Sequence, residues 1–362
     1  MGSMAESAPP LIRFLREPQS SVRFQRSDWE DLLRSARRGQ LLARVARVAA
    51  MAGLTGKLPD KVNPHFQSAL QIAQSHARSV AWETRQLRDA LAGVEIPFVL
   101  LKGAAYIAAN LEAGHGRLMS DIDIMVQRSA LEPAEKSLIE HGWFPTKLDA
   151  YDQRYYRTWM HELPPLQHLE RGTSLDVHHT ILPPTASLKP DMEKLWQASL
   201  PAAGDPLVRV FAPVDMILHS AVHLFHDGDM RHGLRDLVDI DALIKQFSGT
   251  VGFWETFVQR AIEMDLTRPC HYALKYCRLW LATPIPDRVT AAVRQSGAPA
   301  AFAGGIMDRL LPASLGAVLE PDPGPRARLA DFLMYVRSHY LRMPMHLLIP
   351  HLLRKRFARD ER

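Results

Sequence analysis

Residues 97–126, PFVLLKGAAYIAANLEAGHGRLMSDIDIMV, constrain the fold of this chain more than any other stretch. The apolar run at 98–101 lies between Pro97 and Gly103 and predicts a short strand that is buried on both faces. A helical pattern follows from 104 to 111. At 121–126 aspartate then alternates with aliphatic residues, which is the period of a half-buried strand. The stretch therefore predicts a strand, a glycine turn, a helix and a second strand.

The alternation in the second strand places two carboxylates on one face. Successive side chains of a strand point to opposite faces, so Ile122 and Ile124 can enter a core while Asp121 and Asp123 stand together on the other side. Neighbouring carboxylates repel each other, and a cation between them removes the repulsion. We therefore expect Asp121 and Asp123 to bind a divalent cation.

A later pair of strands carries a third aspartate. The segments 165–169 and 174–178 flank a short turn that contains glycine, which predicts an antiparallel hairpin. In the second of these strands Asp176 and His178 share one face, and the aliphatic residues share the other. If this strand lies beside the strand of Asp121, the three carboxylates meet.

This order of elements resembles the core of the polymerase-β-like nucleotidyltransferases, and more closely the bacterial nucleotidyltransferase family 5. The matching residues are Leu101-Lys102-Gly103-Ala104, Arg117, Ser120-Asp121-Ile122-Asp123 and Leu175-Asp176-Val177-His178. The resemblance implies an α+β fold, in which a polymerase-β-like core with a small mixed sheet is flanked by N-terminal and C-terminal all-helical regions. We expect an N-terminal helical region at 1–95, the nucleotidyltransferase core at 96–184 and a C-terminal helical domain at 185–362.

The resemblance also implies a reaction. A nucleotidyltransferase moves an NMP group from an NTP such as ATP to an acceptor and releases pyrophosphate. Two Mg²⁺ ions can clamp the attacking and leaving oxygens of such a displacement, and Mg²⁺ prefers carboxylate oxygens. Asp121 and Asp123 would bridge the two ions. Asp176, whose context fits the family's third carboxylate, would complete the site on the nucleophile side. It could accept the proton of the nucleophile directly, or lower the pKa of the hydroxyl through the metal.

The phosphates of the NTP need donors as well as metal ions. Gly103 marks the strand-to-helix turn, where a missing side chain lets phosphate approach the backbone N–H groups of the helix N-terminus. Lys102 and Arg117 are candidate phosphate contacts, and Ser120 can add a hydroxyl. Serine commonly follows the glycine in the wider superfamily, whereas this chain has Ala104, and we expect Lys102 to supply the missing contact.

Each of these residues also has a structural interpretation. An Asp-x-Asp pair on an exposed strand can serve solubility alone. Lys102 can be a surface cation, and Arg117 can form an ion pair with Asp121. His178 can be a hydrogen-bonding neighbour of Asp176 without contacting substrate.

A histidine-rich segment follows the predicted core. His219, His223 and His226 are spaced by four and three residues, which places them on one face of a helix. A zinc peptidase helix has glutamate directly after the first histidine, and Ser220 occupies that position, which argues against hydrolytic zinc. The candidates for substrate contact, with a structural ion-pair network as the alternative, are His178, His223, Arg231 and Asp236.

Composition limits the compartment and the partners. The formal net charge of +5 suits a phosphorylated ligand and does not call for nucleic acid. The only two cysteines, Cys270 and Cys277, form no disulfide framework, so we expect a cytoplasmic protein. No uninterrupted apolar run reaches membrane-spanning length, and no transmembrane segment is expected. The basic residues at 354–359 can dock on the protein, on a partner or peripherally on a membrane.

Three functions remain open from the sequence. The first is an Mg²⁺-dependent nucleotidyltransferase that acts on a hydroxyl or phosphate of a small molecule, a peptide or a glycan precursor. The second is a protein-nucleotidylating (AMPylating) enzyme, whose basic tail would dock the partner. The third is a non-catalytic nucleotide-binding scaffold, against which the presence of all three carboxylates argues.

Overall fold

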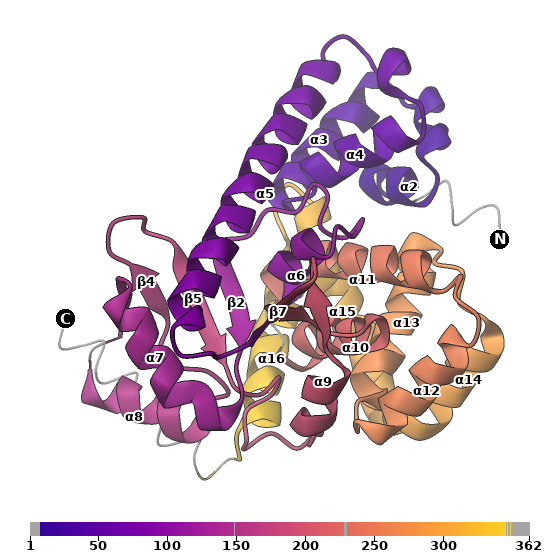
Figure 1. The fold of residues 1–362 in the computed structure, drawn as a ribbon. Coiled ribbons are helices and arrows are strands. Elements are labelled where there is room, and N and C mark those ends of the chain that lie inside the picture. Colours follow the sequence, from indigo (N-terminus) through magenta and orange to yellow (C-terminus); the bar gives the residue numbers. More distant parts are fainter. Residues whose placement is uncertain (1–7, 148, 228–229, 345, 347, 349–362) are drawn as a thin grey trace.

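A computed structural model of the chain describes residues 8–147, 149–227, 230–344, 346 and 348. Its body is a mixed sheet surrounded by helices, and an arm of helices extends from this body (Figure 1). The long helix α5 (Asn63–Ala92) joins the two, because it contacts α4 in the arm and α6, α7 and β7 in the body.

The described part of the N-terminal region is helical, as expected. Its other helices are α2 (Pro10–Arg16), α3 (Arg26–Arg38) and α4 (Leu42–Met51), with 3₁₀ turns at Pro18–Arg23 and Thr55–Lys57. At the start of α3, Asp28 Oδ2 accepts the backbone N–H of Gln25 at 2.8 Å. This contact closes the helix N-terminus, where backbone donors lack partners within the helix.

The sheet of the described residues has seven strands in the order β3-β4-β5-β2-β1-β7-β6. They are β1 (Phe98–Leu100), β2 (Asp121–Met125), β3 (Trp143–Pro145), β4 (Leu166–His168), β5 (Ser174–His178), β6 (Leu200–Ala202) and β7 (Asp205–Val210). Strand β2 is antiparallel to β1 and parallel to β5, and β4 with β5 forms an antiparallel hairpin. The strands predicted from the sequence are therefore present.

The prediction that the region after residue 184 is all helical is wrong in one respect. Strands β6 and β7 form a hairpin there, and β7 pairs in parallel with β1. A buried strand such as β1 needs hydrogen-bond partners on both sides, because unpaired backbone groups are costly away from water. The sheet therefore continues to Val210, past the expected boundary.

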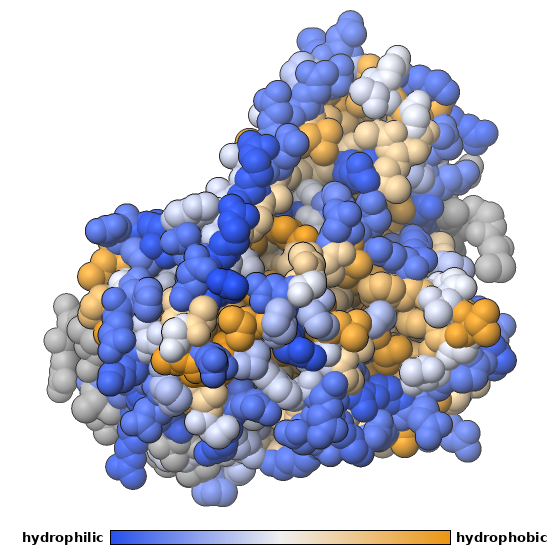
Figure 2. All heavy atoms as spheres, viewed as in Figure 1, coloured by the Kyte–Doolittle hydropathy of each residue, from blue (hydrophilic) through white to orange (hydrophobic). Residues whose placement is uncertain are grey.

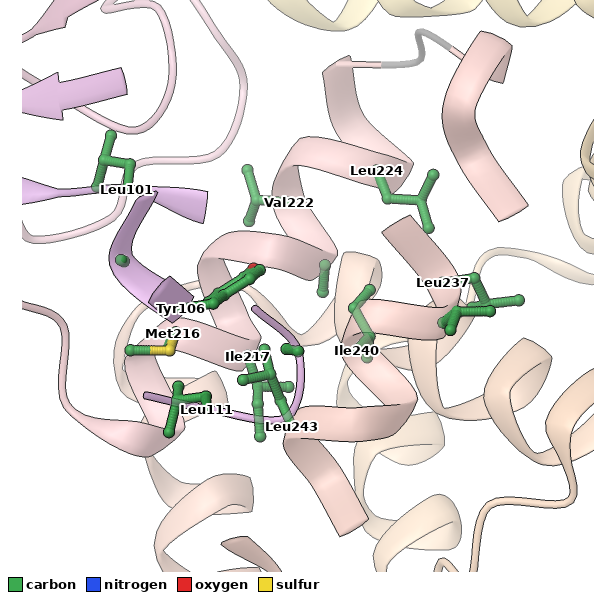
Figure 3. Close-up of a cluster of buried hydrophobic side chains, with 14 of the residues drawn as sticks. Leu101, Tyr106, Leu111, Met216, Ile217, Val222, Leu224, Leu237, Ile240 and Leu243 are labelled. Atoms are coloured by element: carbon green, nitrogen blue, oxygen red, sulfur yellow. The ribbon is translucent and has the colours of Figure 1, made fainter. Parts of the chain in front are cut away.

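Helices cover the sheet and, with the loops between them, make up the rest of the described chain. They are α6 (Lys102–Ala108), α7 (Leu131–Glu140), α8 (Ala150–Trp159), α9 (Met192–Ala198), α10 (Pro213–Val222), α11 (Gly233–Phe247), α12 (Phe253–Glu263), α13 (Thr267–Leu281), α14 (Asp287–Gly297), α15 (Ala301–Leu315) and α16 (Pro325–Arg342). Apolar side chains of α6, α10 and α11 form one part of the core (Figure 3). Within it Tyr106 Oη and Ser220 Oγ are hydrogen-bonded at 2.6 Å, which ties α6 to α10.

One helical stretch of the described residues, Ala301–Leu319, has the length and composition needed to cross a membrane. Only 22% of it is buried in the fold, where α15 contacts α11 and α16. It is not an uninterrupted apolar run, because Asp308 and Arg309 lie within it. The basic segment at 354–359 lies outside the described residues.

Candidate active site

The register of two parallel strands brings the three predicted aspartates together. Asp123 on β2 lies directly opposite Asp176 on β5, and Asp121 lies opposite Ser174. Residues paired across strands share a face, as do residues two apart along one strand. Asp121, Asp123 and Asp176 therefore lie on one face, and the intervening aliphatic side chains of both strands are buried on the other.

Asp123 is the most buried of the three carboxylates, with 7% of the residue exposed. Its Oδ1 accepts a hydrogen bond from Lys102 Nζ at 3.1 Å and lies 3.1 Å from His178 Nε2. Burial alone would raise the pKa of Asp123, but the Lys102 charge and the His178 hydrogen bond hold it well below its usual value. Asp123 is therefore ionised at neutral pH.

Asp176 behaves in the opposite way. Burial, followed by the charges of Glu162 and Asp123, raises the pKa of Asp176 to about 7, and Asp121 adds to the effect. The negative charge of Asp121, Asp123, Glu162 and Asp176 is therefore only partly neutralised by the cationic side chains near them. A set of oxygen donors with excess negative charge fits Mg²⁺, which binds carboxylates and keeps positions for water and phosphate.

Glu162 is a member of this group that the sequence did not reveal. An isolated antiparallel bridge pairs it with His178, and its Oε2 lies 3.5 Å from His178 Nδ1. Its side chain is 16% exposed. Glu162 lies in a short segment before β4 that has no regular hydrophobic periodicity. No local pattern in the sequence therefore indicates that Glu162 reaches the site.

Lys102 reaches Asp123 through an unusual backbone conformation. Its φ of 48° lies in the left-handed region, which non-glycine residues rarely adopt. Such a conformation costs about 1 kcal/mol or more and persists where the surrounding structure enforces it. Here it turns the chain from β1 into α6 while the amino group stays against Asp123.

Gly103 has a different role from the expected one. A Cβ added to Gly103 would lie 2.5 Å from Met119 Cε and 2.6 Å from Arg117 Nε. The space on this side of the backbone is thus filled by two side chains and is not open for a phosphate. Glycine is required because Arg117 and Met119 pack directly on the turn.

Substitution Gly103→Ala is accordingly expected to lower the free energy of unfolding by about 1–3 kcal/mol. The added methyl group must displace Arg117, which is held by buried ion pairs and cannot move freely. Urea denaturation followed by circular dichroism measures the change. As a matched control, Gly56→Ala is expected to change stability by less than about 0.5 kcal/mol, because an added Cβ meets nothing within 4 Å. Equal effects of the two substitutions would contradict this account.

Arg117 belongs to a buried ion-pair network between the arm and the body. Its Nη1 donates to Asp236 Oδ1 at 3.2 Å and also to Asp239 Oδ2, and Arg44 Nη2 on α4 donates to Asp239 Oδ1 at 3.1 Å. The side chain of Arg117 is only 5% exposed. The prediction that Arg117 contacts phosphate is therefore wrong, because phosphate cannot reach this buried guanidinium. Arg117 does form ion pairs, as its structural interpretation expected, but with Asp236 and Asp239 and not with Asp121.

Asp236 belongs to the same network. It is buried and accepts from Arg117 and from Arg235 Nε at 3.0 Å. Burial alone would raise its pKa, but Arg117 and Arg235 lower the pKa of Asp236 to about 2. The structural alternative thus describes Asp236 better than substrate contact does.

The remaining predicted contacts are Ser120, His223 and Arg231. Ser120 Oγ donates to Asp121 Oδ1 at 3.2 Å. His223 lies near enough for its charge to lower the pKa of Asp123, and its Nε2 is 3.9 Å from Asp236 Oδ2. Arg231 is exposed on the turn Met230–His232 before α11.

The expected histidine face is interrupted. Helix α10 ends at Val222, and a π-helical turn follows at His223–Asp227, so the three histidines do not continue one regular helix. His219 is buried with its ring centroid 5.5 Å from that of Phe211. His219 lies in α10 as expected, but the π-helical turn changes the direction of His223 and His226 relative to it.

A groove of about 760 Å³ opens beside Asp121. Its walls are α5, residues 120–122 and residues 171–173. Arg78, Trp82 and Arg85 line it from α5 at spacings of four and three, which places them on one side of the helix. Figure 2 shows that α5 presents mostly hydrophilic side chains along its outer length. The indole ring of Trp82, with the residue 42% exposed, adds an aromatic surface to this basic groove.

Comparison with known proteins adds one finding to this geometry. A family model with the description "uncharacterised nucleotidyltransferase" matches residues 25–282, which include the arm from near the start of α3, the whole sheet and the helices as far as α13. No curated protein matches the chain significantly.

Proposed function

The chain belongs to this nucleotidyltransferase family, and from that premise we propose that it transfers an NMP group from an NTP to a hydroxyl or phosphate of an acceptor. The acceptor would be a small molecule, a peptide or a glycan precursor. The observation that carries the proposal is the pairing of Asp123 with Asp176 across β2 and β5, with Asp121 on the same face. Three carboxylates in one place are costly unless cations join them.

Asp121, Asp123 and Asp176 would hold two Mg²⁺ ions. When bound, Mg²⁺ neutralises the charge that develops on the phosphate oxygens. Lys102, whose amino group already lies at Asp123, donates to a phosphate oxygen of the NTP. Asp176 would lie on the side of the acceptor, where it would take the proton of the acceptor hydroxyl directly or help the bound cation to lower the pKa of that hydroxyl.

The groove beside Asp121 is the proposed approach to these residues. Arg78 and Arg85 provide positive charge for phosphate groups, and Trp82 offers a face on which a base or another flat group can stack. Both features suit a nucleotide or a phosphorylated acceptor, and Ser120 and Asp121 are among the residues that line the groove.

The function can be tested with labelled nucleotides. Purified protein is incubated with each α-³²P-labelled NTP and Mg²⁺, with and without a cell extract, and the products are separated by size. We expect label on a small acceptor. Label on a protein would favour the nucleotidylation of a partner. If no NTP gave labelled product under any condition, the proposal of an enzyme would be wrong.

The binding of Mg²⁺ is expected to depend on pH. A proton on Asp176 competes with the cation below the raised pKa of about 7. The affinity for Mg²⁺ should therefore rise by about tenfold from pH 6 to pH 8, with most of the change below pH 7. Isothermal titration calorimetry at both pH values measures it.

The variant Asp176→Asn provides the control for this prediction. It lacks the titrating carboxylate, so its affinity for Mg²⁺ should be weaker and should change less between the two pH values. An equal pH dependence in the variant would assign the effect to another group. One such group is His178: burial alone would lower its pKa, but the hydrogen bond to Asp123 and the charge of Glu162 raise it.

A further inference from the structure

We infer that His161, Glu162 and His178 form a second cation site that takes a divalent transition-metal ion such as Zn²⁺. Each residue offers one ligand atom, and these atoms all lie within 4.8 Å of one another. The site borders the three aspartates but consists of other residues. It stands on its own geometry, whether or not the protein transfers nucleotides.

The separations of the ligand atoms suit one small ion. Glu162 Oε2 is 3.5 Å from His178 Nδ1 and 3.9 Å from His161 Nε2. Ligands at about 2.0–2.2 Å from a tetrahedral Zn²⁺ are roughly 3.3–3.6 Å from one another. The two measured separations are close to this range, and small rotations of the imidazole rings, whose centroids are 5.1 Å apart, bring the two nitrogens nearer.

The orientation of His178 is the second observation. Its Nε2 lies 3.1 Å from Asp123 Oδ1, so this nitrogen carries the proton and donates to the carboxylate. The other ring nitrogen, Nδ1, faces Glu162 at 3.5 Å, and a metal ion bound there would take the place of any proton on Nδ1. A carboxylate that accepts from the far nitrogen of an imidazole is the usual outer partner of a metal-bound histidine, because it holds the tautomer and the ring orientation.

The three side chains are largely withdrawn from water. Those of His161, Glu162 and His178 are 10%, 16% and 6% exposed. The charge of Glu162 acts strongly on a cation held there, because little water screens it. Two nitrogens and one oxygen favour Zn²⁺ over Mg²⁺, which selects oxygen ligands. The bound ion would fasten Glu162, ahead of β4, to the end of β5.

The test measures metal binding directly. The full chain is dialysed against micromolar Zn²⁺ with millimolar Mg²⁺, so that oxygen-only sites are occupied by Mg²⁺, and bound zinc is measured by mass spectrometry. We expect one more Zn²⁺ per chain in the wild type than in Glu162→Gln. The affinity of this ion should fall more than the 10–100-fold that is typical when only an outer partner of a ligand is lost. Zn²⁺ should also raise the melting temperature of the wild type but not of the variant.

Two matched variants separate this site from its surroundings. His179→Gln changes a buried neighbouring histidine outside the cluster, and Asp121→Asn changes the proposed Mg²⁺ site. Both should retain the zinc. The inference is overturned if the wild type binds no such ion, if Glu162→Gln retains it, or if His179→Gln loses it equally. His161→Ala is a second variant that removes a ligand, and it should also lose the zinc. If His161→Ala does not fold, the near-isosteric Glu162→Gln decides the outcome.

Discussion

Asp123→Asn is expected to reduce nucleotidyl transfer by about 1000-fold, which corresponds to a loss of about 4 kcal/mol of transition-state stabilisation. Asparagine has nearly the same shape but no charge. It cannot neutralise the Lys102 amino group and would hold divalent cations poorly, although it can still accept hydrogen bonds from Lys102 and His178. The measurement is kcat/KM with the labelled NTP at saturating Mg²⁺.

The control for this experiment removes an aspartate elsewhere. Asp60 is exposed in the turn before α5, and Asp60→Asn should leave kcat/KM unchanged. The melting temperature of each variant shows whether the fold is intact. Activity of Asp123→Asn within tenfold of the wild type, in a folded protein, would remove Asp123 from the proposed catalytic group.

Arg117→Met is expected to have the largest effect on stability, a loss of about 3–5 kcal/mol in the free energy of unfolding. Methionine keeps most of the length of the side chain but leaves the buried carboxylates of Asp236 and Asp239 without this partner. Asp236 keeps Arg235 and Asp239 keeps Arg44, but the loss of one cation from a buried network is costly because little water reaches the two carboxylates. Urea denaturation measures the difference between the wild type and the variant.

A surface arginine provides the comparison. Arg34 is 53% exposed in its side chain and pairs with Glu30 and Asp31 on α3. Arg34→Met should cost less than about 1 kcal/mol, because water screens exposed ion pairs. Arg117→Lys should fall between these values, since it keeps the charge but loses the fork of donors. A loss below 1 kcal/mol in Arg117→Met would contradict a structural role for the network.

The local elements were predictable because their causes are local. The period of two at Asp121–Met125 and the turn glycine between β4 and β5 depend on neighbouring residues alone, and both predictions agree with the structure. The hairpin β6–β7 was missed because Leu200 to Val210 lies among helical segments, and its place depends on the distant edge of β1.

The functions of single side chains were less predictable. Arg117 and Gly103 were assigned to phosphate from their places in a motif. Their partners come from α11 and from Met119, which the motif does not include. Glu162 had no signal, because it lies outside the predicted strands and only its bridge with His178 at the end of β5 brings it to the site.

What the sequence determined is which side chains can share a face: Asp121 with Asp123, and Asp176 with His178, because side chains alternate along any strand. The tertiary structure alone decided that β5 lies beside β2 in parallel, with Asp176 opposite Asp123. It also decided which charges are neutralised, since Lys102 pairs with Asp123 while Asp176 faces Glu162. Strand order and charge pairing depend on contacts between distant segments, and these form only when the whole chain packs.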